Sequence, residues 1–342
     1  MNISDEQKVI YGVLIVALIG LGLWSQLSRP PKISQPNLPS PIRLLAVGDI
    51  NLGRVTGQKI LAGDNNYAFE YMAEQLSRPD LTFGNLESQL ADLGGETQSP
   101  TNEYRFAGPP AGADGLQESG FDIVSIANNH MWDYGKDALF STIDNLDRVG
   151  VKHAGASKNP LDVYQPTIVE LKDQKIAFFA VTGLLNGYEK SGALEHVAWA
   201  DPGKLIPAIE QVKGLVDWVI VSVHWGSEYV ESPNQKQVDL AHQLVDAGAQ
   251  LIIGHHSHVP QGVEEYHDGL ILYSLGNFAF WQPMTYWTQN SFIAEITLYP
   301  STGMVEYNPV AVDAGWQPRL ATDDDEAKIL QHIAQLSKAL QK

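Results

Sequence analysis

Residues 42–51 read IRLLAVGDIN, an apolar run rich in β-formers that ends in Gly48, Asp49 and Asn51. A continuous apolar run of this length between turn signals is typical of a strand buried on both faces. Such strands belong to sheets that are covered on both sides. Similar runs recur along the chain, at 81–83, 121–127, 175–182, 217–224, 251–253 and 270–274.

Helical patterns alternate with these runs. One apolar stripe comprises Leu139, Ile143, Leu146 and Val149, and another comprises Val238, Ala241, Leu244 and Val245. Helices of this kind lie with the apolar stripe against a sheet. After residue 292 we expect two more strands, FIAEITLY and MVEYNPVAV, and then a helix from about residue 323 to the end. The alternation predicts an α/β domain.

The composition restricts both the class of protein and the kind of site. The chain has 342 residues, 44% hydrophobic and 18% charged, as expected for a folded globular protein. Lys and Arg number 22 against 40 Asp and Glu, and the formal charge of −18 argues against a nucleic-acid partner. The absence of cysteine excludes disulfides, thiolate zinc sites and iron–sulfur clusters. Any metal must therefore be held by His, Asp, Glu or Asn.

The N-terminus predicts a membrane anchor. Residues 9–24 (VIYGVLIVALIGLGLW) carry no charge, and with 25–27 they reach about the length that a bilayer core requires. A cleavable signal peptide is the alternative, but the run exceeds the usual apolar region and no Ala-x-Ala-like site follows. We therefore expect a leader (1–8), a transmembrane signal anchor (9–27) and a Pro-rich, extended linker (28–41).

Polar side chains follow five of the predicted strands at the point where each strand ends. In open α/β folds, ligands bind at the carboxyl ends of the strands. Oxygen and imidazole ligands from separate strands suit a pair of divalent ions such as Mn, Zn, Fe or Mg. The residues at the five ends are Asp49 and Asn51; Asn85 and Glu87; Asn128, Asn129 and His130; His224; and His255, His256 and His258.

Most of these residues also have a simpler interpretation. Asp49 suits an ordinary strand-to-loop turn, and His224 suits a buried structural histidine. Glu87 has Arg54 and Arg105 as alternative partners for an ion pair. The cluster at 255–258 is different, because three imidazoles within four residues have little structural use. We therefore favour metal binding there.

A set of motifs in a fixed order makes the chain resemble a known family. It resembles the CapA family of capsule proteins, which is associated with poly-γ-glutamate capsule synthesis, export or anchoring. That family is similar to the calcineurin-like metallophosphoesterases. The motifs span about 42–282 and comprise VGDINLGR (47–54), GNLE (84–87), ANNHMWDYG (127–135), HWGSE (224–228), GHHSHV (254–259) and SLGNF (274–278).

The resemblance implies a four-layer α/β/β/α sandwich over 42–315, followed by a C-terminal helical segment at 316–342. It also implies two divalent ions between the sheets, with a shared water as nucleophile. His130 would be the acid that protonates a leaving group. The implied metal ligands are Asp49 for the first ion, Asn129 and His224 for the second, His256 and His258 to complete the pair, and Glu87 near the position of a bridging carboxylate.

The chain also departs from the phosphoesterase pattern. Asn51 stands where a His usually follows the first Asp, and Asn85 and Glu87 stand where a bridging Asp is usual. Met131 occupies a position often held by a carboxylate. A shift of one residue would also make His255, rather than His256, the ligand.

Other residues are predicted to surround the metal ligands or to contact the substrate. Arg105 is a candidate for binding an anionic substrate, although a surface-loop arginine is an equally good interpretation. Aromatic residues at 281, 286 and 287 are candidates for the rim of the pocket. The full set of candidates is Asn51, Arg54, Asn85, Arg105, Asp133, Glu228, His255 and Asn277.

Three functions fit these features. The first is a membrane-anchored, metal-dependent hydrolase that acts on an anionic polymer such as poly-γ-glutamate, or on its precursor. The second is a non-catalytic capsule-assembly or polymer-binding component. The third is a metal-dependent phosphodiesterase whose substrate is unrelated to capsules.

The expected location is the cell membrane, with a single span and an extracytoplasmic main domain. The charges flanking the span, Lys8 on one side and Arg29, Lys32 and Arg43 on the other, mildly favour the opposite orientation. The resemblance decides for the outside, because an N-terminal anchor with an extracytoplasmic domain is common in the family. Membrane synthase or export subunits are the expected protein partners.

Overall fold

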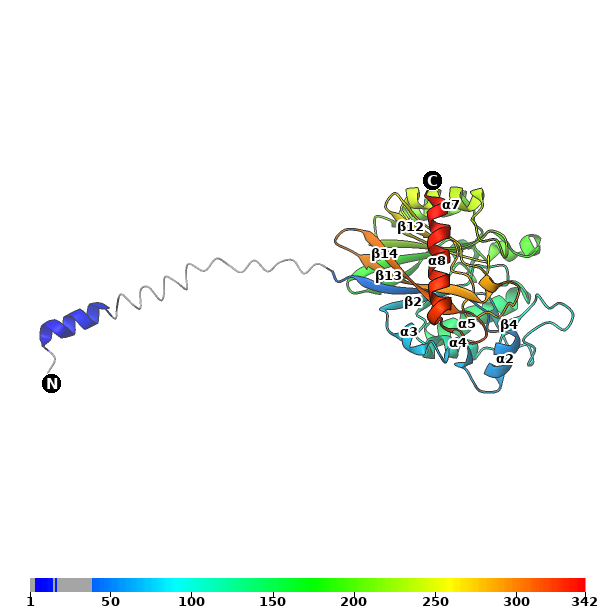
Figure 1. Cartoon of the computed structure of the whole chain (residues 1–342), viewed down its shortest axis with the longest axis horizontal. Coiled ribbons are helices and arrows are strands. Elements are labelled where there is room, and N and C mark those ends of the chain that lie inside the picture. Colours follow the sequence, from blue (N-terminus) through cyan, green and yellow to red (C-terminus); the bar gives the residue numbers. More distant parts are fainter. Residues whose placement is uncertain (1–3, 15, 17–38, 342) are drawn as a thin grey trace. The chain divides into compact units, whose positions relative to one another are not determined.

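The computed structural model describes residues 4–14, 16 and 39–341. The chain divides into two units, Met1–Leu38 and Pro39–Lys342 (Figure 1). In the first unit, residues 5–14 and 16 are helical. The rest of the predicted anchor, 15 and 17–27, and the linker up to 38 lie outside the described residues. Among the described residues, no helix is both long and apolar enough to cross a membrane.

A seven-stranded mixed sheet forms one half of the second unit. Its strands, in spatial order, are β15 (Arg319–Leu320), β14 (Met304–Asp313), β13 (Asn290–Tyr299), β1 (Ile42–Ile50), β2 (Leu81–Leu86), β5 (Ile123–Ser125) and β6 (Lys152–Ala154). The strands from β1 to β6 are parallel, whereas β13, β14 and β15 continue the sheet in antiparallel pairing.

A six-stranded sheet forms the other half. Its strands, in spatial order, are β11 (Val263–Tyr266), β12 (Gly269–Leu272), β10 (Leu251–His255), β9 (Trp218–His224), β8 (Gln174–Thr182) and β7 (Thr167–Leu171). The four central strands are parallel, and the two edge strands pair antiparallel with their neighbours. A short ribbon of β3 (Gln89–Leu90) and β4 (Ala107–Gly108) stands apart from both sheets.

Helices α2 to α7 lie between these strands in the sequence, and α8 follows the last one. Among residues 39–341, the α-helices are α2 (Arg54–Leu61), α3 (Ala73–Ser77), α4 (Gly112–Glu118), α5 (Gly135–Val149), α6 (Pro202–Val212), α7 (Gln235–Ala247) and α8 (Asp323–Leu340). Within the same range, the short 3₁₀ turns are η1 (Tyr67–Phe69), η2 (Pro160–Asp162), η3 (Tyr188–Lys190), η4 (Ala193–Glu195) and η5 (Tyr286–Thr288).

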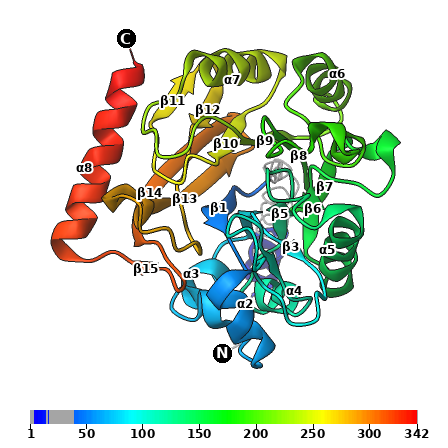
Figure 2. The ribbon, with the colours of Figure 1, turned by 90° about the vertical axis from the view of Figure 1, so that its right-hand side faces the viewer.

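The two sheets pack face to face, as the alternation along β8 shows. Ile176 and Phe178 point toward the seven-stranded sheet, where Phe178 stacks on Phe83 of β2 with ring centroids 5.9 Å apart. Ala177 and Phe179 point the other way, into a separate cluster with α6 and α7. Helices α3 to α5 lie beyond the seven-stranded sheet, on the side opposite α6 and α7 (Figure 2). The polypeptide is therefore buried on both faces of both sheets over much of their length.

The predicted α/β class is confirmed, and most predicted strands and helices are present. The run at 121–127 forms only a three-residue strand, because the chain turns away at 126 into the loop that carries Asn129 and His130. Strands β6, β7 and β11 were not predicted; each has at least one exposed residue, so its sequence lacks a long apolar run. Within the expected C-terminal segment, α8 is preceded by the short strand β15.

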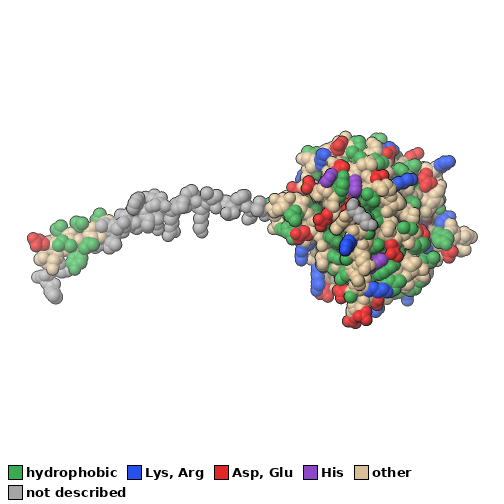
Figure 3. Space-filling view, turned by 45° about the horizontal axis from the view of Figure 1, so that its top comes forward, with side chains coloured by type: hydrophobic (Ala, Val, Ile, Leu, Met, Phe, Trp, Pro, Cys, Tyr) green, Lys and Arg blue, Asp and Glu red, His purple; other side chains and the backbone are tan. Residues whose placement is uncertain are grey.

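The surface of the folded unit is mixed in charge. On the face drawn in Figure 3, acidic side chains are interspersed with Lys and Arg rather than gathered into one patch.

Gly48 permits a close backbone approach at the end of β1. The backbone N–H of Asp49 donates to Gly276 O at 3.0 Å, and the backbone N–H of Phe278 donates to Asp49 O at 3.0 Å. A Cβ atom on Gly48 would lie 2.0 Å from Gly276 O, which is backbone and cannot rotate away. The glycine therefore fixes where the side chains of Asp49 and Asn277 emerge.

We expect Gly48→Ala to lower the free energy of unfolding by at least about 2 kcal/mol, because the added methyl must displace backbone. Gly214 is the matched control, since a Cβ there has no atom within 4 Å. Gly214→Ala should change stability by less than about 0.5 kcal/mol. Urea denaturation followed by tryptophan fluorescence measures both, and equal effects of the two substitutions would contradict this account.

Candidate metal centre

The carboxyl ends of four strands meet where the two sheets face each other. Asp49 pairs with Asn85 in the register of β1 and β2, and His255 pairs with His224 in the register of β10 and β9. The sheets touch here through β1 and β10. Asp49, Glu87, His224, His255 and His258 are each at most 1% exposed. The predicted strand-end residues thus converge in a buried, highly polar cluster.

Asp49 is contacted from several sides. Its Oδ1 accepts a hydrogen bond from Asn85 Nδ2 at 2.9 Å and lies 3.3 Å from His255 Nδ1. Its Oδ2 lies 3.1 Å from His258 Nδ1 and accepts from the backbone N–H of His256 at 3.3 Å. Burial by itself raises the pKa of this carboxyl, but the contacts with His255 and His258 hold the pKa well below its usual value. Asp49 is therefore a buried carboxylate anion.

One carboxylate oxygen of Glu87, Oε1, lacks a hydrogen-bond partner among the described residues, whereas the other, Oε2, accepts from Asn85 Nδ2 at 3.4 Å. Oε1 lies 3.6 Å from His224 Nε2, 3.8 Å from His258 Nε2 and 3.9 Å from His130 Nε2. These distances are too long for hydrogen bonds. Burial, and then the charge of Asp49, raise the pKa of Glu87 well above its usual value.

The space around Glu87 Oε1 fits a divalent ion. Two ligand atoms of a tetrahedral zinc ion, each about 2.1 Å from the metal, stand roughly 3.4 Å apart. Glu87 belongs to two groups of possible ligands, one with His256 and His258 and one with Asp49 and His224. Within each group the ligand atoms lie within 4.8 Å of one another. Glu87 is therefore the residue that both possible ion positions share.

The second group extends to Asn129. The Oδ1 of Asn129 lies 2.7 Å from His224 Nε2, and His256 Nδ1 lies 3.1 Å from the same nitrogen. Burial, and then the charge of His256, lower the pKa of His224 well below its usual value. Burial, and then the charge of His258, lower the pKa of His256 to about 3. Both imidazoles are thus neutral near neutral pH, which is the form that binds metal.

Two histidines in the loop after β10 have an unusual backbone conformation. His256 has φ +91° and His258 has φ +58°, and residues other than glycine seldom adopt positive φ values of this size. Tyr229, whose backbone N–H donates to Ser257 O at 2.8 Å, also has a positive φ of 63°. Backbone strain of this kind persists where the surroundings impose it, and it clusters at functional sites.

His130 stands beside the cluster with one nitrogen occupied. Its Nδ1 donates to Asp133 Oδ2 at 2.8 Å, and its ring stacks on Phe106 with centroids 4.2 Å apart. Asp133 Oδ2 also accepts from the backbone N–H of Phe106 at 3.2 Å, which fixes the carboxylate. His130 Nε2 is left on the side of Glu87 and of the neighbouring cavity.

Amides support the ligands from behind. Asn277 Oδ1 lies 2.9 Å from His258 Nδ1, and Asn277 Nδ2 donates to Thr288 O at 2.9 Å. Asn51 Oδ1 accepts from the backbone N–H of Gly53 at 2.8 Å. The Nδ2 of Asn51 is buried without a partner among the described residues. Asn277 thus orients a candidate ligand, whereas the oxygen of Asn51 is committed to a local turn.

The structure also separates His255 from His256. His256 belongs to a possible ligand group with Glu87 and His258. Neither ring nitrogen of His255 has a hydrogen-bond partner among the described residues, and its ring packs 6.0 Å from that of Phe83. His255 therefore lies behind Asp49, on the core side of the cluster.

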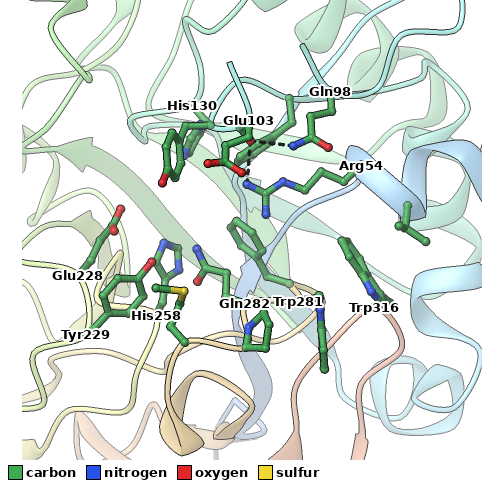
Figure 4. A pocket seen from close by; sticks show the side chains of 16 residues that line it. Arg54, Gln98, Glu103, His130, Glu228, Tyr229, His258, Trp281, Gln282 and Trp316 are labelled. Atoms are coloured by element: carbon green, nitrogen blue, oxygen red, sulfur yellow. Dashed lines mark hydrogen bonds between the residues drawn. The ribbon is translucent and has the colours of Figure 1, made fainter. Parts of the chain in front are cut away.

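A cavity of about 430 Å³ opens beside the cluster. Figure 4 shows Arg54 reaching into it from the side opposite Glu228 and Tyr229, with His130 and His258 also exposed to it. Trp281 lines the same cavity, as predicted for an aromatic rim. The cluster is thus accessible from solvent through a mixed polar and aromatic opening.

Arg105 and two predicted rim aromatics lie elsewhere. Arg105 Nε donates to the backbone carbonyl of Asp133 at 2.8 Å, and Arg105 lines a second, adjoining cavity. Tyr286 donates to Asp325 of α8 at 2.7 Å, and Trp287 stacks on His332 of the same helix with centroids 3.7 Å apart. These two aromatics therefore hold the C-terminal helix.

Two asparagines contribute more than the sequence indicated. Asn128 Nδ2 donates to Asn85 Oδ1 at 3.1 Å and to Leu86 O at 2.8 Å, which ties the third strand end to the second. Asn186 Oδ1 accepts from Asn129 Nδ2 at 3.2 Å. Asn128 is one of the strand-end residues, but the sequence indicated no specific contact for it. Asn186 lies in an irregular loop after β8, where no residue spacing points to a site.

Comparisons with known proteins agree with these motifs. The family model described as "Bacterial capsule synthesis protein PGA_cap" matches residues 43–282. The "Capsule biosynthesis protein CapA" of Bacillus anthracis is 28% identical over 331 residues, covering 94% of this chain and 79% of that protein. The "PGA biosynthesis protein CapA" of Bacillus subtilis is 28% identical, covering 95% of this chain and 85% of that protein.

Two further similarities were found, one to a curated protein and one to a solved structure. A "Probable polyglutamine synthesis accessory protein" of Mycobacterium tuberculosis is 29% identical over 167 residues, covering 45% of this chain and 44% of that protein. Among solved structures, the 5′-nucleotidase of Candida albicans superposes with a TM-score of 0.46 at 11% identity, over 87% of this chain and 58% of that chain.

We expect Glu87→Gln to reduce the divalent metal retained by the purified full chain to the background level, because both candidate ligand groups lose their shared carboxylate. Glu264→Gln is the matched control. Glu264 also lies beside a histidine, His242, at 3.1 Å, but it is outside the cluster. Inductively coupled plasma mass spectrometry measures the metal. Metal content in Glu87→Gln equal to that of wild type would contradict the assignment.

The same substitution should have the opposite effect on the metal-free fold. The raised pKa of Glu87 means that its charged form opposes folding, so the penalty is absent at low pH and grows as the pH rises through that pKa. In the presence of a chelator, Glu87→Gln should therefore be more stable than wild type at neutral pH, with a difference that shrinks in acid. Urea denaturation across a pH series tests this, and a less stable variant at neutral pH would disprove it.

Proposed function

Because the chain belongs to the PGA_cap family of bacterial capsule synthesis proteins, we propose that it acts in poly-γ-glutamate capsule synthesis, export or anchoring, with a dinuclear-metal hydrolytic site. The N-terminal apolar segment anchors it in the cell membrane as a single span, and the main domain lies outside the cytoplasm. Its partners in this proposal are the anionic polymer or a precursor of it, and membrane synthase or export subunits.

One observation carries the proposed chemistry. Glu87 Oε1 is fully buried, has no hydrogen-bond partner among the described residues, and lies between the Nε2 atoms of three histidines. A buried carboxylate oxygen without a hydrogen bond is costly, whereas one that coordinates a metal is not. Neutral imidazoles and carboxylates are the donors that divalent transition metals take from proteins without cysteine.

The fold supports the same proposal. Two sheets packed face to face, with helices beyond each, match the four-layer sandwich expected of calcineurin-like metallophosphoesterases. In that arrangement the ions lie between the sheets, where this cluster lies. The proposed ligands are Asp49, Glu87, Asn129, His224, His256 and His258.

The metal pair and His130 have separate roles in the proposed hydrolysis. A pair of divalent ions, when bound, supplies Lewis acidity and a water nucleophile near neutral pH. Asp133 accepts from His130 Nδ1 and fixes the ring, so that Nε2 faces the cavity. With both ring nitrogens protonated, Nε2 carries the proton for general acid catalysis. His130 then protonates the leaving group, which is an amine when a γ-glutamyl amide is cleaved.

A second candidate function is a polymer-binding component without turnover. Asn51 favours it, because its oxygen is committed to the backbone N–H of Gly53 and it cannot replace the usual imidazole as a nitrogen ligand. The first ion would then have one ligand fewer and bind more weakly. The cavity and the fold would remain, and with them the capacity to hold polymer.

We expect His130→Gln to slow hydrolysis of a γ-linked oligoglutamate by the manganese-loaded full chain about 100- to 10,000-fold, because general acid catalysis is lost. The variant should retain as much metal as wild type, since His130 is outside both ligand groups. His242→Gln is the matched control, because His242 is also paired with a carboxylate, Glu264, but away from the site.

Chromatographic detection of the shortened oligomers measures the rate. Equal turnover by His130→Gln and wild type would contradict the role of His130. Binding without turnover by wild type would favour the polymer-binding function. Cleavage of a generic phosphodiester together with no binding of the oligoglutamate would favour a phosphodiesterase unrelated to capsules.

A further inference from the structure

A single arginine, and no lysine, lines the cavity beside the cluster. Of the sixteen residues around it, Arg54 is the single Lys or Arg, and Glu103 and Glu228 are the acids. The guanidinium reaches the cavity from the first residue of α2, whose backbone has φ +51°. Arg54 is the last residue of the motif that contains Asp49, so the same segment supplies a candidate ligand and this cation.

The guanidinium is held rigidly by aromatic rings. Its Cζ lies 4.6 Å from the ring centroid of Phe106 and 5.6 Å from that of Phe280. Its Nη2 donates to the backbone carbonyl of Glu103 at 3.2 Å, which is drawn in Figure 4. Cation–π contacts orient a guanidinium without neutralising it. Arg54 is therefore a fixed cation that can bind an anionic group in the cavity.

Arg54 also lacks the partner that a half-buried arginine usually has. Its Nε is buried with no hydrogen-bond partner among the described residues. Within the same residues, Arg54 forms no salt bridge, whereas Arg148 is paired with Asp114 at 2.7 Å. Guanidinium groups taken partly out of water are normally matched by an anion. Arg54 thus presents to the cavity a guanidinium that is not ion-paired with any described carboxylate.

We infer that Arg54 binds a carboxylate of the substrate and so determines specificity for a polymer that carries a free carboxylate on each unit. This inference rests on the proposed function and names the group through which the cavity recognises the polymer. A γ-linked glutamyl chain presents such a carboxylate beside every amide bond. With one unit at the metal centre, the carboxylate of a neighbouring unit meets the planar fork of Arg54.

The acids in the wall limit this recognition to one carboxylate. Glu228 lies across the cavity from Arg54, and Glu103 lies on the same wall (Figure 4). Both repel a second anion in the same space. Arg54 therefore accounts for selective binding of an anionic chain by a protein whose formal charge is −18.

The adjoining cavity offers space for further units of the bound polymer. This second cavity, of about 390 Å³, shares His130, Glu228 and Tyr229 with the first. Its own arginine, Arg105, is already engaged by the carbonyl of Asp133 and lies over the ring of Tyr134 at 5.0 Å. The two cavities thus flank His130, with the free guanidinium on one side only.

The test is equilibrium binding of two synthetic probes to the full chain in detergent with manganese. The probes are a fluorescent γ-linked oligoglutamate and the same oligomer with every carboxylate converted to a carboxamide. All proteins carry His130→Gln, so that turnover does not consume the probe. The compared substitutions are Arg54→Gln, Arg54→Lys and, as a matched control, Arg319→Gln, since Arg319 also lies over an aromatic ring, at 3.8 Å from that of Tyr71.

We expect Arg54→Gln to weaken binding of the oligoglutamate about 10- to 100-fold, as for a lost charged hydrogen bond, and to leave binding of the carboxamide unchanged. Arg54→Lys should recover part of the loss, and Arg319→Gln should match the parent. The parent itself should prefer the carboxylate probe about tenfold or more, which tests the inference even if Arg54→Gln fails to fold.

Three results would overturn the inference. Unchanged oligoglutamate binding by folded Arg54→Gln, or equal affinity of the parent for the two probes, would remove the role of Arg54 and leave the proposed function standing. Failure of the parent to bind either probe would instead overturn the proposed polymer function, and the inference with it.

Discussion

Two carboxylates, Asp49 and Glu87, are buried without any arginine or lysine paired to them in the described part of the chain, and the rest of the site is arranged around that constraint. Histidines surround both, and burial keeps His224 and His256 neutral. In our proposal, a divalent ion held by the donor types present balances this buried negative charge. The pKa values of Asp49 and Glu87 shift in opposite directions. Burial raises both, but contacts with His255 and His258 outweigh it at Asp49, whereas the charge of Asp49 adds to it at Glu87.

The two-sheet architecture makes such a site possible. Parallel strands deliver their carboxyl ends to one edge of each sheet, and face-to-face packing brings the two edges together. Gly48 adds a local condition, because the backbone of 276–278 can approach β1 only where no Cβ intervenes. Arg54 then places a cation where the cluster opens to solvent, so the first strand and its following helix serve both the proposed metal chemistry and the proposed recognition of the polymer.

Much of this arrangement could be predicted from the sequence, for a physical reason. A buried strand appears in the sequence as a continuous apolar run, and the polar residue after the run marks its end. Asp49, Glu87 and His224 could therefore be identified as strand-end residues from the sequence alone. The edge strands β6, β7 and β11 were missed because exposure breaks the apolar pattern. The roles of Asn186 and Phe106 were also missed, because each depends on a contact between segments far apart in the sequence. Spacing does not separate His255 from His256, because the packing of the His255 ring against Phe83 is a contact between segments far apart in the sequence.

We propose that Glu87 is shared by two divalent ions. A crystal structure of the manganese-soaked protein, with anomalous diffraction recorded on both sides of the manganese absorption edge, tests this most directly. This account predicts two anomalous peaks in contact with Glu87, one also near His256 and His258 and the other also near Asp49 and His224. A well-ordered cluster without an anomalous peak at Glu87, its Oε1 hydrogen-bonded to water or to an imidazole instead, would contradict the account.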